Sequence, residues 1–229
     1  MEKEERIKLK NKKRYTKKEL TNPPKPKRVL ELFSGTGSVG KVFKARGWEV
    51  VSVDIDQKYM EPTHLTDILE WDYAKAYPVG HFDLVFASPP CATFSKLKNA
   101  CLGRQLKRGV FTMEVMMREE RDIGVPCLRK AEEIIKYFQP KYWILENPQT
   151  GRMKNYMGDT PFNDVSYCQY GFGYRKQTRM WNNITDWKTK TCGKCCPLYG
   201  SHAGLPSTLT MRYRIPPNLV DEIFEQVSV

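Results

Sequence analysis

The sequence predicts an α/β fold, a doubly wound and mostly parallel sheet covered by helices, with a small irregular C-terminal segment. Three observations predict it. Short apolar runs alternate with segments of helical period, a glycine-rich turn follows the first run, and 229 residues suffice for one full core. Ligands of such sheets bind at the carboxyl ends of the strands, so the site is expected there.

The first half of the chain reads as a strand-helix-strand unit. A strand is expected over residues 28–33, and the turn Ser34-Gly-Thr-Gly-Ser-Val-Gly40 leads into a helix that Gly47 ends. The second strand is expected over residues 49–54.

The second half continues the alternation. Strands are expected at 82–87 and 141–146, and the helix between them begins near Pro126, with apolar residues three and four positions apart. Two late strands are expected at 166–170 and 180–184. Residues 217–227 form an amphipathic closing helix whose apolar face packs on the core.

Charge is concentrated at the N-terminus. The formal net charge is +12, and residues 1–28 carry 12 lysines and arginines against 4 acidic residues. We therefore predict a basic, disordered arm over 1–27, either simply solvated or binding polyanions, a catalytic domain over 28–187, and a cysteine-containing loop region with the closing helix over 188–229.

Hydropathy and cysteine usage restrict the protein class. No apolar run approaches the length of a membrane span, and the basic N-terminus has no secretory apolar region. Seven cysteines without a pairing framework favour a reducing, intracellular compartment.

The glycine turn has the spacing of a nucleotide-binding loop. Gly35, Gly37 and Gly40 match G-x-G-x-x-G, and Asp54 ends the next strand 19 residues after Gly35. Such an acid binds ribose hydroxyls in several cofactor classes, so the motif alone leaves an NAD-dependent reductase open, as well as a turn without a ligand.

Two further strand ends carry reactive side chains. Cys91 follows Ser88-Pro-Pro directly after a strand, and Glu146 with Asn147 ends the neighbouring one. A cysteine in that position is a candidate nucleophile and the glutamate a candidate proton carrier.

Together these motifs resemble the cytosine-C5 DNA methyltransferase family, particularly its short viral or phage-type members. The resemblance covers residues 28 to about 183 and rests on Phe33-Ser-Gly-Thr-Gly37, Asp54, Asp67, Ser88-Pro-Pro-Cys91 with Phe94-Ser95, and Glu146-Asn147-Pro148. It implies a Rossmann-like, class I S-adenosylmethionine-dependent methyltransferase fold. It also implies methylation of C5 of a cytosine that has left the duplex.

The resemblance also implies roles for single residues. Cys91 is the thiolate that adds to cytosine C6, and Glu146 contacts N3 and the exocyclic amine. S-adenosylmethionine is expected at Phe33, Ser34, Gly35, Thr36, Gly37, Asp54, Ile55, Asp67, Ile68, Ser88 and Pro89. Double-stranded DNA is the expected partner, and nucleic-acid contacts are expected from Ser95, Lys96, Lys98, Arg104, Lys107, Arg108 and Arg175.

The chain departs from the family pattern in places. Pro148 stands where the family usually has valine, and Ala92 where it has glutamine. The motif that supports the cytosine carbonyl fits Arg175, Lys176 or Arg179, of which Lys176 and Arg179 are favoured as catalytic residues. No large target-recognition insert is found, so a protein partner could supply target recognition.

A cysteine cluster follows the catalytic region. Cys192, Cys195, Cys196 and His202 have ligand types suited to zinc, with a single C-x-x-C spacing. A surface loop with reduced thiols is the alternative.

Three other functions stay open. A methyltransferase acting on N4 of cytosine or N6 of adenine also uses a Pro-Pro motif here, but it places an aromatic residue where Cys91 stands. A silent nucleic-acid-binding protein on the same fold would not need Cys91 and Glu146. RNA as substrate is not separated from DNA by these motifs.

Overall fold

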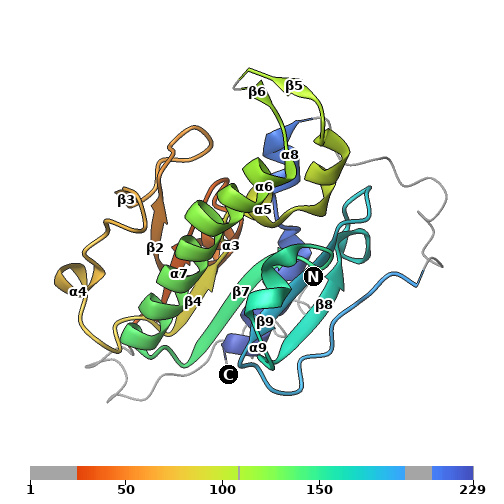
Figure 1. Ribbon diagram of the computed structural model, residues 1–229. Helices are drawn as coiled ribbons and strands as arrows, with labels where there is room; N and C mark the ends of the chain where they lie inside the picture. Colours follow the sequence, from red (N-terminus) through yellow and green to blue (C-terminus); the bar gives the residue numbers. More distant parts are fainter. Residues whose placement is uncertain (1–24, 108, 194–207, 229) are drawn as a thin grey trace, which may run out of the picture.

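A seven-stranded sheet between two layers of helices forms the body of the protein (Figure 1). The computed structural model describes residues 25–107, 109–193 and 208–228. The strands are β1 (Arg28–Leu32), β2 (Glu49–Asp54), β3 (His64–Leu65), β4 (Leu84–Ala87), β7 (Tyr142–Pro148), β8 (Phe162–Ser166) and β9 (Gln177–Asn182). Their order is β3-β2-β1-β4-β7-β9-β8, and only β9 runs antiparallel to its neighbours. The predicted α/β, mostly parallel sheet is confirmed.

Helices cover both faces of this sheet. On one face α3 (Ser38–Ala45) packs beside α9 (Pro217–Val227), and on the other lies α7 (Val125–Phe138). The α7 helix continues from α6 (Met113–Glu119) through a π-helical turn, η2 (Glu120–Gly124). Shorter elements are α4 (Tyr73–Ala76), α5 (Cys91–Phe94), α8 (Leu209–Tyr213), η1 (Lys96–Cys101), η3 (Arg152–Tyr156), η4 (Tyr167–Tyr170) and a projecting hairpin of β5 (Gln105–Leu106) with β6 (Gly109–Val110).

Alternating side chains in the central strands feed two cores. In β4, Leu84 and Phe86 face α3 and α9, whereas Val85 faces α7. All three are at most 1% exposed. Burial on both faces explains why the central strands read as continuous apolar runs rather than as alternating ones.

The predicted strands at 28–33, 49–54, 82–87 and 141–146 are confirmed within one or two residues at most ends, as are the helix near Pro126 and the closing helix. The strand expected at 166–170 is wrong. β8 ends at Ser166, and Tyr167–Tyr170 form a 3-10 turn that Gly171 ends with φ 94°. Tyr167 and Tyr170 are both buried in the core under α9, so their aromatic character reflects burial rather than strand pairing.

The predicted basic arm lies almost entirely outside the described residues. Within the described part of the chain, no helix is long and apolar enough to cross a membrane.

Candidate active site

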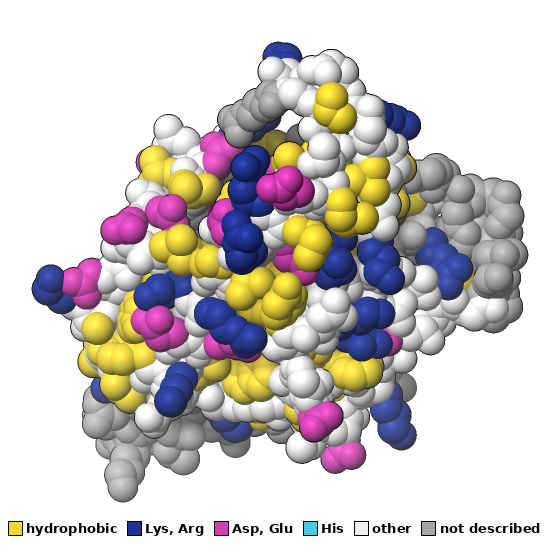
Figure 2. Space-filling model, viewed as in Figure 1, with side chains coloured by type: hydrophobic (Ala, Val, Ile, Leu, Met, Phe, Trp, Pro, Cys, Tyr) yellow, Lys and Arg dark blue, Asp and Glu magenta, His cyan; other side chains and the backbone are white. Residues whose placement is uncertain are grey.

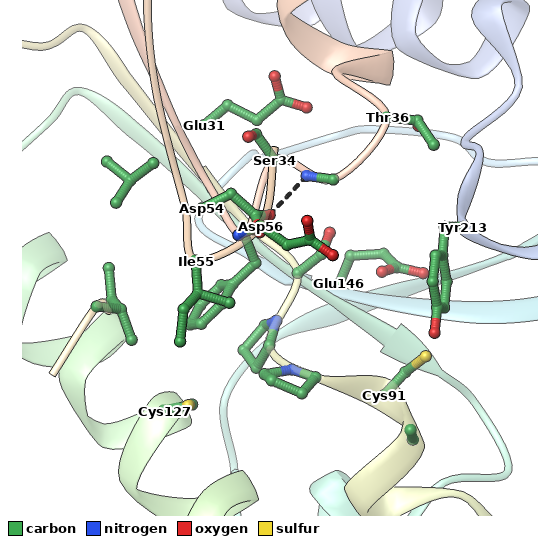
Figure 3. A pocket seen from close by; sticks show the side chains of 18 of the residues that line it. Glu31, Ser34, Thr36, Asp54, Ile55, Asp56, Cys91, Cys127, Glu146 and Tyr213 are labelled. Carbon is green, nitrogen blue, oxygen red and sulfur yellow. Dashed lines mark hydrogen bonds between the residues drawn. The ribbon is translucent and has the colours of Figure 1, made fainter. Parts of the chain in front are cut away.

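The turn between β1 and α3 has an unusual backbone that a carboxylate from the next strand holds in place. Phe33, Gly35 and Gly37 have φ of 57°, 47° and 64°. The Gly35 N–H donates to Asp54 Oδ2 over 2.7 Å (Figure 3). The left-handed conformations explain two of the glycines, since glycine adopts them without a Cβ clash.

Gly40 is needed for a different reason, which lies in Glu31. The buried Glu31 carboxylate accepts the N–H groups of Val39 (3.1 Å) and Gly40 (2.9 Å) at the start of α3. A Cβ on Gly40 would lie 2.7 Å from Glu31 Oε2 and 2.8 Å from Val50 Cγ1. Burial raises the pKa of Glu31 to about 7, although the two amide hydrogen bonds oppose that rise.

Glu31 was missed by sequence reasoning. The available signal was a glutamate inside an otherwise apolar strand, directly before the glycine turn. A charged side chain there must find buried partners, and the third glycine of the motif makes room for them.

Cys91 begins the single helical turn α5, beyond the end of β4. Its side chain is partly buried. Burial raises the pKa of the Cys91 thiol, the nearby Lys176 ammonium opposes that rise, and the Glu146 carboxylate adds to it. The thiol therefore needs further help from its surroundings to ionise near neutrality.

Glu146 lies on the neighbouring strand β7 and is 5% exposed. The Tyr167 hydroxyl donates to Glu146 Oε1 over 3.2 Å, and Lys176 Nζ lies 3.6 Å from the same oxygen. Next to it, Asn147 Nδ2 donates to the Pro89 carbonyl over 2.9 Å, which ties the two catalytic loops together.

These strand ends surround one pocket of about 640 Å³ (Figure 3). Most predicted cofactor and catalytic residues line it: Phe33, Ser34, Gly35, Thr36, Asp54, Ile55, Asp67, Ile68, Ser88, Pro89, Cys91, Glu146 and Lys176. Gly37 is not among the lining residues. The structure therefore brings the predicted cofactor turn and the predicted catalytic pair into a single cavity.

The C-terminal region also contributes to this pocket, which the sequence did not indicate. Tyr213 ends α8, Ile215 follows, and both line the cavity, with the Tyr59 ring 6.0 Å from that of Tyr213. Burial and, next, the nearby Cys91 thiol raise the pKa of Tyr213. Asp122 and Ile123 of η2 are further lining residues that were not predicted.

Arg179 and Arg175 lie elsewhere. Arg179 projects from β9 toward β8, where Nε and Nη2 each donate to Asp164 over 2.8 Å, and its guanidinium lies over the Phe162 ring. Neither Arg179 nor Arg175 is among the lining residues, and the Arg175 Nε is buried without a hydrogen-bond partner. Of the two favoured basic residues, the structure brings Lys176 alone to Glu146.

The predicted nucleic-acid contacts lie on η1 and the hairpin that follows the nucleophile. Lys96, Arg104 and Lys107 are exposed, and Figure 2 shows basic side chains beside the projecting hairpin. Lys98, in contrast, pairs with Glu119 and lies over the Phe111 ring, while Ser95 caps η1 through the Leu97 N–H. Arg108 lies outside the described residues.

A second, smaller pocket of about 280 Å³ adjoins the first. Lys41 and Arg214 line it together with the hydroxyls of Thr36, Ser38 and Thr210. Among its lining residues there is no carboxylate, in contrast to the acidic main pocket.

The predicted zinc ligands cannot be placed together. Cys192 is buried, and its backbone N–H donates to Ser166 Oγ, but Cys195, Cys196 and His202 lie outside the described residues. Elsewhere in the described ranges, no group of three His, Cys, Asp or Glu side chains could hold a metal ion.

Comparison with known proteins adds a close relative. No protein-family model matches the chain. The "Probable DNA (cytosine-5)-methyltransferase" of Frog virus 3 (isolate Goorha) is 40% identical over 219 residues, which cover 86% of this chain and 99% of the viral protein.

Solved structures are more distant. A putative DNA modification methyltransferase from an E. coli prophage is 15% identical with a TM-score of 0.45, covering 72% of this chain and 51% of that one. Spodoptera frugiperda DNMT2 is 17% identical with a TM-score of 0.40, covering 72% and 53%. The chain thus spans about half the length of these two proteins.

The sheet order and the cavity at its carboxyl edge define a Rossmann-like α/β enzyme of the class I methyltransferase fold. The relative then fixes the family, since the match spans nearly its whole length. The chain belongs to the DNA (cytosine-5)-methyltransferase family.

Proposed function

We propose that the protein transfers a methyl group from S-adenosylmethionine to C5 of a cytosine in DNA, through a covalent adduct of Cys91 at C6. The observation that carries this proposal is the shared pocket. Cys91 and Glu146 come from adjacent parallel strands and face the same cavity as the glycine turn and Asp54. The viral relative at 40% identity supports the same activity.

The chemistry of the main pocket suits a cationic cofactor. Its lining includes the carboxylates of Glu31, Asp54, Asp56, Asp67, Asp122 and Glu146, and Lys176 is the one basic residue among them. Ser34 Oγ is buried there without a hydrogen-bond partner, so it is available to a ligand. S-adenosylmethionine carries a sulfonium and an ammonium, which this acidic surface favours.

The same features disfavour a dinucleotide. In dinucleotide-binding folds the pyrophosphate binds the free N–H groups at the start of the first helix. Here the Val39 and Gly40 N–H groups already donate to Glu31, and a pyrophosphate would meet that carboxylate. The NAD-dependent reductase is therefore the weaker interpretation.

The cofactor's own carboxylate would find its partners in the smaller pocket. Lys41 and Arg214 supply positive charge there, while Asp54 and Asp67 remain available for ribose and adenine in the main pocket. When bound, S-adenosylmethionine supplies an electrophilic methyl group.

The residues of the chain provide the remaining chemistry. The Cys91 thiolate forms an S–C6 bond, and the C5=C6 π electrons move toward C5, which makes C5 nucleophilic. Glu146 binds the N3 and amine edge of the cytosine and supplies a proton to N3, which favours that addition. After C5 has gained the methyl carbon, C5 loses its proton to solvent and the S–C6 bond breaks, which restores the double bond and the thiolate.

Lys176 supports both partners in this scheme. Its ammonium keeps the Glu146 carboxylate in place and favours the thiolate form of Cys91. Lys176 is therefore the better candidate than Arg179 for the basic residue at the target base. Exposed Lys96, Arg104 and Lys107 would contact phosphates of the substrate.

A trapping experiment tests this function. The protein is incubated with S-adenosylmethionine and duplex DNA containing 5-fluorocytosine, followed by a denaturing gel and mass spectrometry, with Cys91→Ala as the control. Because fluorine at C5 cannot leave as a proton does, an adduct at Cys91 is expected to accumulate. Methyl transfer to ordinary DNA without any adduct would instead indicate amino-group methylation, and adduct formation with RNA alone would reassign the substrate.

A further inference from the structure

A buried ion pair between Glu120 and Arg152 lies behind the pocket, and neither residue lines it. Glu120 is 6% exposed, and Tyr156 Oη also donates to it over 3.0 Å. Replacing a buried ion pair by apolar residues is often neutral or stabilising, so fold stability alone does not explain such a pair.

Arg152 reaches the helix that carries the nucleophile. Its Nη2 donates to the Thr93 carbonyl over 3.1 Å, two residues after Cys91. α5 has only four residues and no side-chain hydrogen bond at its N-terminus, so its own hydrogen bonds cannot fix its position. A cation on a carbonyl at the end of the turn supplies a tertiary restraint.

The partner of Arg152 is tied to the pocket wall. Glu120 is the first residue of η2, the π-helical turn whose Asp122 and Ile123 line the cavity. At the end of η2, a Cβ on Gly124 would clash with the Thr93 side chain, so α5 and η2 pack at the shortest distance glycine allows. π-helical turns inside α-helices frequently occur at functional sites.

Arg152 is also tied to the strand of the second catalytic residue. It begins η3 six residues after Glu146, and the preceding Gly151 N–H donates to the Pro148 carbonyl over 2.8 Å. A Cβ on Gly151 would lie 3.0 Å from that carbonyl oxygen. The guanidinium thus connects the Cys91 helix, the Glu146 loop and the π-helical wall.

We infer that Arg152, held by Glu120, is a positioning residue that sets the location of Cys91 relative to Glu146 and to a base in the pocket. This inference rests on the proposed function, because it assigns Arg152 a role in adduct formation. It does not make Arg152 a catalytic residue, since the side chain acts through the backbone of α5.

The test uses Arg152→Lys, which keeps the charge beside Glu120. A single ammonium lacks the fork that serves Glu120 and the Thr93 carbonyl at once. The matched control is Arg129→Lys. Arg129 also pairs with a glutamate, Glu132, and donates to a backbone carbonyl, that of Tyr156, but it is exposed and does not touch α5.

Four quantities are measured for each variant: the thermal midpoint, the affinity for S-adenosylmethionine, the rate of adduct formation with 5-fluorocytosine DNA, and the pH profile of Cys91 alkylation by iodoacetamide. For Arg152→Lys we expect adduct formation to fall by about 10- to 100-fold, since displacements near 1 Å have effects of that size. We expect the alkylation profile to shift, because Lys176 and Glu146 act on the thiol through distance. Cofactor affinity is expected to match Arg129→Lys.

Two results would overturn the inference. One is an adduct rate and alkylation profile equal to those of Arg129→Lys. The other is a loss of cofactor affinity as large as the loss of adduct rate, which indicates general damage to the fold. If Arg152→Lys does not fold, Tyr156→Phe decides, because it removes one hydrogen bond to Glu120 and should slow adduct formation in the same direction.

Failure of the proposed function gives a different pattern. The wild type would then form no adduct with any nucleic acid, while the alkylation profile of Cys91 would still respond to Arg152→Lys if the positioning role holds.

Discussion

Lys176 Nζ lies 3.6 Å from Glu146 Oε1, and this ion pair joins the loop before β9 to the end of β7 beside the nucleophile. The lysine also donates to the Arg212 carbonyl over 3.4 Å and lies over the Tyr167 ring. Its ammonium therefore has a fixed position among the groups that set the charge of Cys91.

Lys176→Gln should raise the pKa of the Cys91 thiol, because the ammonium is the main charge that opposes the effect of burial. Turnover at neutral pH should fall by about tenfold or more as the thiolate becomes scarcer and Glu146 loses its partner. The measurement is the pH dependence of Cys91 alkylation, resolved by peptide mass spectrometry. Arg179→Gln is the comparison, and an equal shift from that variant would contradict the assignment.

Cys91→Ala should abolish methyl transfer while leaving the affinity for S-adenosylmethionine close to that of the wild type. The sulfur provides the covalent step, whereas the predicted cofactor contacts come from the glycine turn and Asp54. Calorimetry measures the affinity, and transfer of a labelled methyl group measures the activity. An active variant would remove the thiol from the mechanism.

Glu31→Gln should destabilise the protein and change how its stability depends on pH. A carboxamide has one acceptor oxygen, so one of the Val39 and Gly40 N–H groups loses its partner, at a cost of about 1–3 kcal/mol. In the wild type, the pKa of Glu31 is raised from 4.5 to about 7. Its contribution is therefore fully present below pH 4.5 and is lost as the pH rises through about 7, a change of about 3 kcal/mol at most.

Urea unfolding between pH 4 and pH 8 checks this prediction. The wild type should lose stability across that window relative to Glu31→Gln. Glu49→Gln, an exposed glutamate on the adjacent strand, is the control and should keep the wild-type slope. Parallel pH curves for wild type and Glu31→Gln would show that Glu31 does not titrate there.

Asp54→Asn should weaken cofactor binding by about tenfold or more. One carboxylate oxygen accepts the Gly35 N–H and the other the Asp56 N–H, so the side chain shapes the turn as well as facing the pocket. The affinity for S-adenosylmethionine is the measurement. Asp56→Asn is the comparison, since its carboxylate caps the Lys58 N–H instead, and a larger effect there would assign the ribose contact to Asp56.

The sequence determined the order of strands and helices and which residues stand at strand ends. Apolar runs such as residues 82–87 predicted buried strands because a strand covered on both faces must be apolar throughout. Since parallel strands end at one edge, the motifs at Gly35, Asp54, Cys91 and Glu146 could be assigned to a common site before any coordinate was known.

Tertiary structure decided which side chains face the pocket and how they are charged. Lys176 and Arg179 are three residues apart, yet one pairs with Glu146 and the other with Asp164. Glu31, Tyr213 and Arg152 became visible only when distant segments came together, because none belongs to a motif of local spacing. Periodicity is a local property, whereas burial, ion pairing and pKa depend on neighbours that only the packed chain supplies.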